Sequence, residues 1–218
     1  MFVDPGTFSA GRGDADALRR ITPSRRALIG ATAAGLVTAG VASLLPSTGS
    51  TQTTRTDLGK TLIAYFSRTG NTRAVANQIR QTTQGELFEI RTTYAYPDAY
   101  RATTDQAKRE QEENARPTLA ADVEGIESYD AVFLGFPNWW TTMPMTLFTF
   151  LERHRLSGKT IAPFCTHEGS RFGQSLTDIR TLCPNARLLD GLALRGGASG
   201  YVQSDAARQE IADWLRRL

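Results

Sequence analysis

The chain has 218 residues, of which 40% are hydrophobic and 22% are charged. This length suits one globular domain with an additional segment, and the composition excludes a wholly disordered chain. Two Cys and two His are too few for a disulfide framework or a four-thiolate zinc site, so we expect no metal site.

The basic character of the chain comes from its N-terminal segment. The net charge is +3 and the pI is about 9.1. Residues 1–55 contain six Arg and three Asp, which leaves 19 basic and 19 acidic residues in the rest of the chain. A domain with balanced charge offers no broad basic face for a phosphate backbone. The sequence therefore predicts no nucleic-acid partner.

Residues 1–46 are predicted to be a disordered leader that carries an export signal. Arg25 and Arg26 precede a weakly hydrophobic stretch, 27–45, which is followed by Pro46. This pattern resembles a twin-arginine signal and implies transport of the folded protein to the periplasm or the cell exterior. The alternative is a membrane anchor at 27–45, in which case the uncleaved leader would be the membrane contact.

The polar segment 47–56 is predicted to be a linker, and 57–218 to be the folded domain. Runs of β-forming residues predict strands at 61–67, 86–90, 131–136, 160–166 and 186–194. The stretches between them predict helices at 72–83, 100–114, 144–154, 172–182 and 205–218. This alternation predicts an α/β fold of three layers, with a parallel sheet covered by helices on both faces. Ligands of such sheets bind beyond the carboxyl ends of the strands.

The loop after the first strand is a candidate phosphate site. It consists of Ser67, Arg68, Thr69, Gly70, Asn71 and Thr72. Hydroxyl groups, an amide, a glycine and the free N–H groups of a helix start together can bind a phosphate dianion. The same residue types also cap ordinary helices, which is the alternative interpretation.

This loop resembles the Ser/Thr-x-Thr-Gly-x-Thr phosphate loop of flavodoxins, which holds the phosphate of FMN. The similarity covers about 57–200, is closest to the flavodoxin-4 type of oxidoreductase, and includes the segments 95–100, 135–145, 157–170 and 196–197. The resemblance implies FMN as the cofactor and a five-stranded sheet in the order 2-1-3-4-5. Three positions depart from the family pattern: Glu168 and Arg171 replace small residues, and Thr141 replaces a usual glycine.

The loop after the third predicted strand is expected to contact the flavin ring. It contains Pro137, Asn138, Trp139, Trp140 and Thr141. Adjacent side chains leave a strand in different directions, so one Trp is expected to pack inward and the other to form a flat wall for the ring. The alternative is that both Trp plug the loop onto the sheet. Backbone groups around Asn138 are expected to meet the N5 edge of the ring.

By the same resemblance, the loop after the fourth strand lies along the pyrimidine edge of the flavin. Its candidate contacts are Thr166, His167, Glu168, Gly169, Ser170 and Gly173. His167 is a candidate proton donor to a reducible substrate, or else a solvent-facing residue without a role. Glu168 would lower the reduction potential of the flavin unless Arg171 pairs with it.

The resemblance implies an oxidoreductase that carries electrons or hydride from a reduced donor such as NAD(P)H to an acceptor. Small flavodoxin carriers are usually acidic, whereas this domain is neutral. A small-molecule acceptor such as a quinone is therefore at least as plausible as a protein partner. The alternatives are a one-electron carrier for a protein partner and a flavin-binding module without turnover.

Overall fold

The structure is a computed structural model that describes residues 58–197 and 200–218. The predicted leader, export signal and linker lie outside the described residues. Within the described ranges, no helix is both long enough and apolar enough to cross a membrane.

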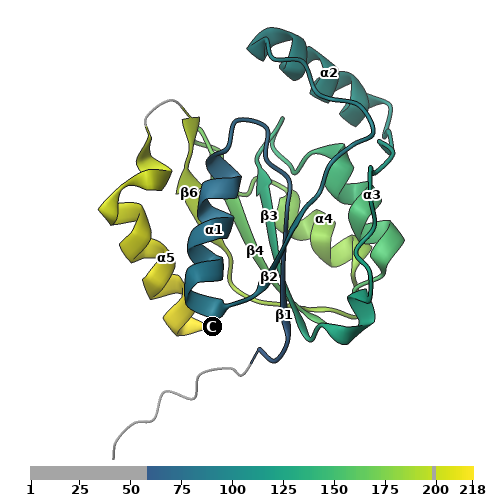
Figure 1. Ribbon diagram of the computed structural model, residues 1–218. Helices are drawn as coiled ribbons and strands as arrows, with labels where there is room; N and C mark the ends of the chain where they lie inside the picture. The colour runs from purple at the N-terminus through teal and green to yellow at the C-terminus, as the bar shows by residue number, and fades with distance from the viewer. Residues whose placement is uncertain (1–57, 198–199) are drawn as a thin grey trace, which may run out of the picture. The chain divides into compact units, whose positions relative to one another are not determined.

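A parallel sheet forms the centre of the domain (Figure 1), in the order β2-β1-β3-β4-β5, and β6 also pairs with β4. The strands are β1 (Thr61–Tyr65), β2 (Glu86–Glu89), β3 (Ala131–Pro137), β4 (Thr160–His167), β5 (Arg187–Leu188) and β6 (Leu192–Arg195). The predicted order 2-1-3-4-5 is thereby confirmed. β3 lies between β1 and β4 and is buried from Ala131 to Phe136, as expected for an uncharged strand that is covered on both faces.

Helices cover both faces of the sheet. They are α1 (Asn71–Thr83), α2 (Tyr100–Glu112), α3 (Met145–His154), α4 (Ser175–Leu182) and α5 (Asp205–Arg217), and short 3-10 turns lie at Ile126–Ser128 and Tyr201–Gln203. α1 and α5 pack on one face of the sheet, and α3 and α4 pack on the other (Figure 1). Strand residues alternate between these two cores: Ile63 and Phe133 face α1 and α5, whereas Leu62 and Val132 face the opposite core.

The fifth predicted strand, 186–194, is divided into two. β5 pairs Leu188 with Ile161, but β6 pairs Leu192 with Phe164, so that three residues on this side oppose two on β4. The carbonyl of Ile161 on β4 accepts a hydrogen bond from the N–H of Leu189, so Ile161 bonds to the β5 side. Every second residue of a strand bonds to the same neighbouring strand. Pro163 therefore faces β5 and β6 with no N–H to donate, and the ladder is interrupted there by a bulge.

Residues with positive φ stand directly before two helix starts. α4 begins at Ser175 rather than at 172, because Arg171 (φ 51°) and Gly173 (φ 52°) adopt left-handed conformations that no helix accommodates. α1 begins at Asn71, directly after Gly70 (φ 91°). Both starts lie at the carboxyl edge of the sheet, so these turns shape the loops of the candidate site.

α2 differs from the other helices because it lies beyond the carboxyl ends of the strands, next to α3 (Figure 1). Its buried residues are Thr103, Ala107 and Glu110. The Glu110 carboxylate accepts hydrogen bonds from the hydroxyls of Tyr94 (2.8 Å) and Tyr96 (2.7 Å) in the loop before the helix. These bonds hold α2 to its own leading loop above the edge of the sheet.

Candidate functional site

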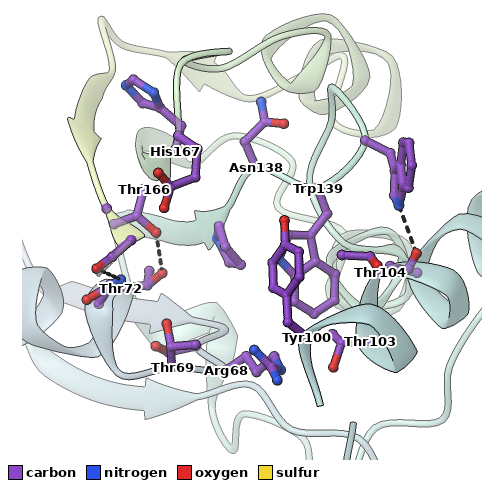
Figure 2. A pocket seen from close by; sticks show the side chains of 18 residues that line it. Arg68, Thr69, Thr72, Tyr100, Thr103, Thr104, Asn138, Trp139, Thr166 and His167 are labelled. Atoms are coloured by element: carbon purple, nitrogen blue, oxygen red, sulfur yellow. Dashed lines mark hydrogen bonds between the residues drawn. The ribbon is translucent and has the colours of Figure 1, made fainter. Parts of the chain in front are cut away.

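A cavity of about 880 Å³ opens at the carboxyl edge of β1, β3 and β4 (Figure 2). Of the predicted site residues, the cavity is lined by Ser67, Arg68, Thr69, Asn71, Thr72, Pro137, Asn138, Trp139, Trp140, Thr166, His167 and Glu168. Five other predicted site residues are not among the described residues that line the cavity: Gly70, Thr141, Gly169, Ser170 and Gly173. The structure thus brings the three predicted loops together around one cavity.

The loop between β1 and α1 presents a run of unused backbone donors. The N–H groups of residues 68–72 donate to no acceptor among the described residues. Gly70 supplies the left-handed turn (φ 91°) that ends the loop. The hydroxyl of Ser67 accepts a hydrogen bond from the N–H of Arg73 (3.2 Å) in the first turn of α1. Successive free N–H groups at a helix start form an anion-binding concavity.

The side chains of this loop have different partners. The hydroxyls of Thr72 and Thr166 are hydrogen-bonded to each other at 2.9 Å and are buried, so they join the first loop to the end of β4. The Arg68 guanidinium donates to the carbonyls of Pro97 (3.1 Å) and Asp98, and it thereby binds the loop that precedes α2. The hydroxyl of Thr69 has no partner among the described residues and lies at the cavity.

The loop after β3 forms a tight two-residue turn with unusual backbone angles. Trp139 and Thr142 exchange both N–H to carbonyl bonds, at 2.7 and 3.1 Å. The two central residues, Trp140 (φ 50°) and Thr141 (φ 69°), are both left-handed. Turns of this kind normally contain Asn or Gly at these positions. A non-glycine residue held there costs about 1–3 kcal/mol of backbone strain.

The two Trp side chains leave this turn in different directions, as predicted. Trp139 is half-buried and packs edge to face against Phe66 and Tyr96, with ring centroids 5.4 and 5.2 Å apart. Trp140 is 47% exposed, and its Nε1–H donates to the carbonyl of Thr104 (2.9 Å) on α2. Both side chains line the cavity. The stacking of either ring on a flavin stays a prediction.

Asn138 fastens the loop after β3 to the loop after β4. Its N–H donates to the carbonyl of Thr166 (2.8 Å), and its Nδ2 donates to the carbonyl of Arg171 (2.7 Å). The expected contact with the N5 edge of a flavin cannot come from this N–H, because Thr166 already uses it. The Oδ1 atom of Asn138 is buried and has no hydrogen-bond partner among the described residues.

His167 is held as a neutral imidazole at the end of β4. Its Nδ1 accepts a hydrogen bond from the N–H of Gly169 (3.0 Å), which assigns the ring proton to Nε2. Burial, followed by the positive charges of Arg171 and Arg195, lowers the pKa of His167 below its usual range. The imidazole is therefore uncharged at neutral pH.

The sequence analysis considered an ion pair between Glu168 and Arg171. Among the described residues, the structure shows no such pair. Its carboxylate lies against the α-carbon of Gly197, where any Cβ would overlap it. Gly197 has φ 77°, and its carbonyl accepts a hydrogen bond from the side chain of Asn71 (3.3 Å). The glycine pair 196–197 therefore permits the close approach of Glu168 and the first loop.

Four residues of α2 complete the cavity and were not predicted as site residues. They are Tyr100, Thr103, Thr104 and Ala107, at the spacing i, i+3, i+4 and i+7. This spacing places them on one stripe of the helix, which the sequence could have shown. Gly196 and Gly197 also line the cavity; the sequence marked them as part of a resemblance without assigning them to the site.

A family model described as flavodoxin matches residues 60–217. The chain belongs to the flavodoxin family. This membership confirms the predicted family and supports FMN as the cofactor of this flavodoxin-family protein. A comparison with curated proteins gives no match.

Solved structures resemble this flavodoxin-family chain over most of their own length. A protein described as a candidate flavoprotein from Bacteroides eggerthii is 32% identical, with a TM-score of 0.61, over 72% of this chain and 95% of that one. A similar candidate flavoprotein from Bacteroides uniformis is 28% identical, with a TM-score of 0.62, over 72% and 97% of the two chains. A Lactobacillus acidophilus flavoprotein in complex with FMN is 24% identical, with a TM-score of 0.53, over 62% and 92%, and it shares the fold.

Proposed function

We propose that this protein is an FMN-dependent oxidoreductase that passes electrons from NAD(P)H to a small acceptor such as a quinone. The observation that carries the proposal is the run of N–H groups at 68–72, which have no acceptor among the described residues, at one end of the cavity of about 880 Å³. Successive N–H groups at a helix start can bind an anion, and the phosphate of FMN would supply several acceptor oxygens. Cofactor sites are concave, of roughly this size, and mostly apolar with a few placed polar groups.

The residues present fit FMN in both chemistry and position. The N–H groups of 68–72 and the hydroxyl of Thr69 would hold the phosphate without any cationic side chain, because Arg68 is bound to the carbonyls of Pro97 and Asp98. Trp139 and Trp140 offer aromatic surface at the other end of the cavity. When bound, the flavin supplies the transfer of one or two electrons, and the protein supplies binding, orientation and electrostatics.

The proposed reaction converts NAD(P)H, one proton and a quinone into NAD(P)+ and a hydroquinone. His167 can contribute a proton to the acceptor only when its imidazole is charged, and its lowered pKa restricts that form to acidic pH. A catalytic role of His167 therefore predicts turnover that rises as the pH falls below about 6.5, the usual pKa of histidine. The profile of a His167→Gln variant would be flat over the same range.

The first experiment measures FMN affinity by the quenching of flavin fluorescence. We expect Thr69→Val to weaken binding about 10- to 100-fold, because a hydrogen bond to a charged group contributes about 1.5–3 kcal/mol. Thr181→Val on the exposed side of α4 is the matched control and should leave the affinity unchanged. Equal affinities for all three proteins would contradict the phosphate site.

The second experiment follows NAD(P)H oxidation by the FMN-loaded protein with and without 1,4-naphthoquinone. Quinone-dependent oxidation is the expected result. FMN that is reduced only by an added partner reductase would favour the one-electron carrier instead. Tightly bound FMN with no reduction by either route would favour a flavin-binding module without turnover.

We also propose that the leader exports the folded protein by a twin-arginine route. The arginine pair before a weakly hydrophobic stretch supports this proposal. Replacement of Arg25 and Arg26 by Lys should retain the protein in the cytoplasm, as measured by cell fractionation. Unchanged export would contradict the twin-arginine signal.

A further inference from the structure

The segment that carries α2 leaves the body of the domain after β2 and returns to it at nearly the same place. Thr92 and Leu119 form an antiparallel bridge, and the N–H of Thr93 donates to the carbonyl of Thr118 (3.0 Å). Leu119 is buried in the core under α3 and α4. Residues 93–118 therefore form an excursion from the sheet whose base is closed and fixed to the core.

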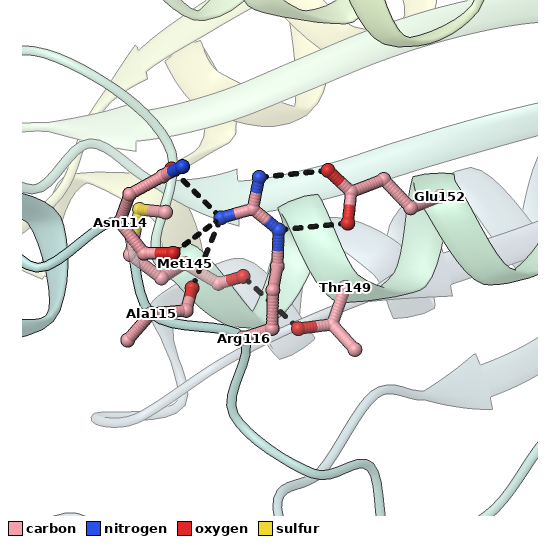
Figure 3. Close-up of polar contacts among 6 residues, drawn as sticks. All are labelled: Asn114, Ala115, Arg116, Met145, Thr149 and Glu152. Carbon is pink, nitrogen blue, oxygen red and sulfur yellow. Dashed lines mark hydrogen bonds and ion pairs between the residues drawn. The ribbon is translucent and has the colours of Figure 1, made fainter.

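Contacts with α3 hold the C-terminal end of this excursion. The guanidinium of Arg116 donates to both carboxylate oxygens of Glu152, each at 2.7 Å (Figure 3). It also donates to the carbonyl (2.9 Å) and to the Oδ1 atom (2.8 Å) of Asn114, at the end of α2. In the leading loop, the hydroxyl of Tyr96 lies 3.1 Å from that of Thr146 on α3. A bidentate ion pair fixes direction as well as distance, so this end of the excursion is anchored.

The N-terminal part of the excursion, residues 97–107, covers the cavity but buries little of itself. Its residues at the cavity are Tyr100, Thr103, Thr104 and Ala107. Only Thr103 and Ala107 are buried, and the hydroxyl of Thr103 donates to the carbonyl of Pro97 (2.6 Å) within the same part. We call residues 97–107 the lid. A segment with so few buried contacts opens at a lower free energy than the core does.

Two side chains from the cavity loops hold the lid closed. The guanidinium of Arg68, in the loop after β1, donates to the carbonyls of Pro97 (3.1 Å) and Asp98. The indole of Trp140, in the turn after β3, donates to the carbonyl of Thr104 (2.9 Å). The contacts at Asp98 and Thr104 are exposed, so water can replace these donors when the lid moves away. We call Arg68 and Trp140 the latch.

Two residues of α2 strengthen the latch without lining the cavity. The side chain of Gln111 donates to the carbonyl of Trp140 (3.2 Å). The ammonium group of Lys108 lies 5.5 Å from the centre of the Trp140 indole, within the range of a cation–π interaction. Neither Lys108 nor Gln111 is among the described residues that line the cavity. Their replacement therefore weakens the latch and leaves the surface of the cavity as it is.

Arg68 joins the phosphate site to the lid. Its N–H belongs to the run of donors at 68–72, whereas its guanidinium holds the first residues of the lid. FMN bound in the cavity contacts the loops that carry the latch, and the lid as well when the lid is closed. A ligand that makes more contacts with one conformation shifts the equilibrium towards it, so FMN favours the closed lid.

We propose that the lid swings away from the cavity, about its anchored end at Glu110 and Arg116, to let FMN enter and leave. This inference rests on FMN as the cofactor and on none of the partners in electron transfer. The rate of FMN exchange is then set by the fraction of molecules in which the lid is open. A weaker latch raises that fraction in the free and in the FMN-bound protein, because the same contacts break in both. Both rate constants therefore rise by the same factor, and the Kd stays unchanged.

The test measures the association and the dissociation of FMN by stopped-flow flavin fluorescence. Gln111→Ala should raise both rate constants about 3- to 10-fold, the equivalent of one lost hydrogen bond. Lys108→Ala should raise both about 2- to 5-fold, the equivalent of one exposed cation–π contact. Arg109→Ala is the matched control, because it removes a positive charge from the same helix at an exposed side chain without a partner among the described residues. It should change neither rate constant.

Faster dissociation with unchanged association in Gln111→Ala would overturn the lid, because α2 would then be a fixed wall whose loosening only weakens binding. Unchanged rate constants in both Gln111→Ala and Lys108→Ala would overturn it as well. The measurement uses FMN alone, so its result is separate from that of the quinone assay. If the protein reduces no quinone but both variants exchange FMN faster at an unchanged Kd, the oxidoreductase function fails while the lid stands.

Discussion

The strained turn after β3 gives a prediction about stability that can be worked out from the structure. Thr141 has φ 69°, its residue is exposed, and its hydroxyl has no partner among the described residues. Replacement by glycine therefore removes about 1–3 kcal/mol of backbone strain and almost no packing. Glycine costs about 0.5–1 kcal/mol through the greater freedom of the unfolded chain. We expect Thr141→Gly to raise the free energy of unfolding by about 0.5–2 kcal/mol.

Thermal unfolding measures this effect, since about 1 kcal/mol shifts the Tm of a domain of this size by roughly 2–4 °C. Gln84→Gly is the matched control. Gln84 also has a positive φ (58°), but it ends α1 and lies outside the cavity lining. Both variants should raise the Tm, and only Thr141→Gly should alter FMN affinity or the KM for a quinone. A lower Tm for Thr141→Gly would refute the assignment of strain to this turn.

Three further predictions concern ionisable groups. Burial raises the pKa of the Cys165 thiol to about 12, so native protein at pH 8 should react with iodoacetamide only as fast as it unfolds; rapid labelling detected by mass spectrometry would contradict this. Glu110→Ala should lower the free energy of unfolding in urea by about 1–3 kcal/mol, because the hydroxyls of Tyr94 and Tyr96 lose the carboxylate that accepts their hydrogen bonds, while Tyr96 keeps its contact with the Thr146 hydroxyl (3.1 Å); Glu110→Gln should lose less. Burial, and then the hydrogen bond to Glu110, raises the pKa of Tyr94 from 10.0 to about 12. The Tyr94 phenol thus stays protonated to a higher pH in the folded state than in the unfolded state. Its contribution to stability is complete below pH 10 and is lost as the pH rises towards 12. The tyrosinate absorbance of the protein minus that of Tyr94→Phe should show this late titration, and a step near pH 10 would exclude it.

The parts of the fold that the sequence predicted correctly depend on local patterns. The uncharged run 131–136 is long enough and apolar enough to specify a buried central strand, and β3 follows it closely. The donors at 68–72 lie together because they are adjacent in the chain, so their placement between β1 and α1 followed from the two elements around them. Family membership is visible in the same segments.

The parts that the sequence missed depend on contacts between distant segments. The bulge opposite Pro163 had one local signal, a proline inside a predicted strand that must also pair with a neighbour. The left-handed conformation of Thr141 had an indirect signal, the glycine that the family usually has at this position, whereas that of Trp140 had none, because tryptophan does not favour it. The position of α2 above the cavity could not be derived from its own sequence, since a polar helix with few buried residues can pack in several ways.

The strained turn and α2 stabilise each other. The left-handed conformation of Trp140 directs its indole to the carbonyl of Thr104 while Trp139 packs inward, and the side chain of Gln111 donates to the carbonyl of Trp140 (3.2 Å). The N–H of Gln174 adds a bond to the carbonyl of Thr141 (2.7 Å). Three hydrogen bonds at about 0.5–1.5 kcal/mol each offset strain of about 1–3 kcal/mol at each of two residues. These free energies are comparable, and two of the three bonds join the turn to α2. We therefore expect neither the turn nor the position of α2 to be stable without the other. The shape of the cavity between α2 and the turn after β3 therefore depends on both elements being docked together.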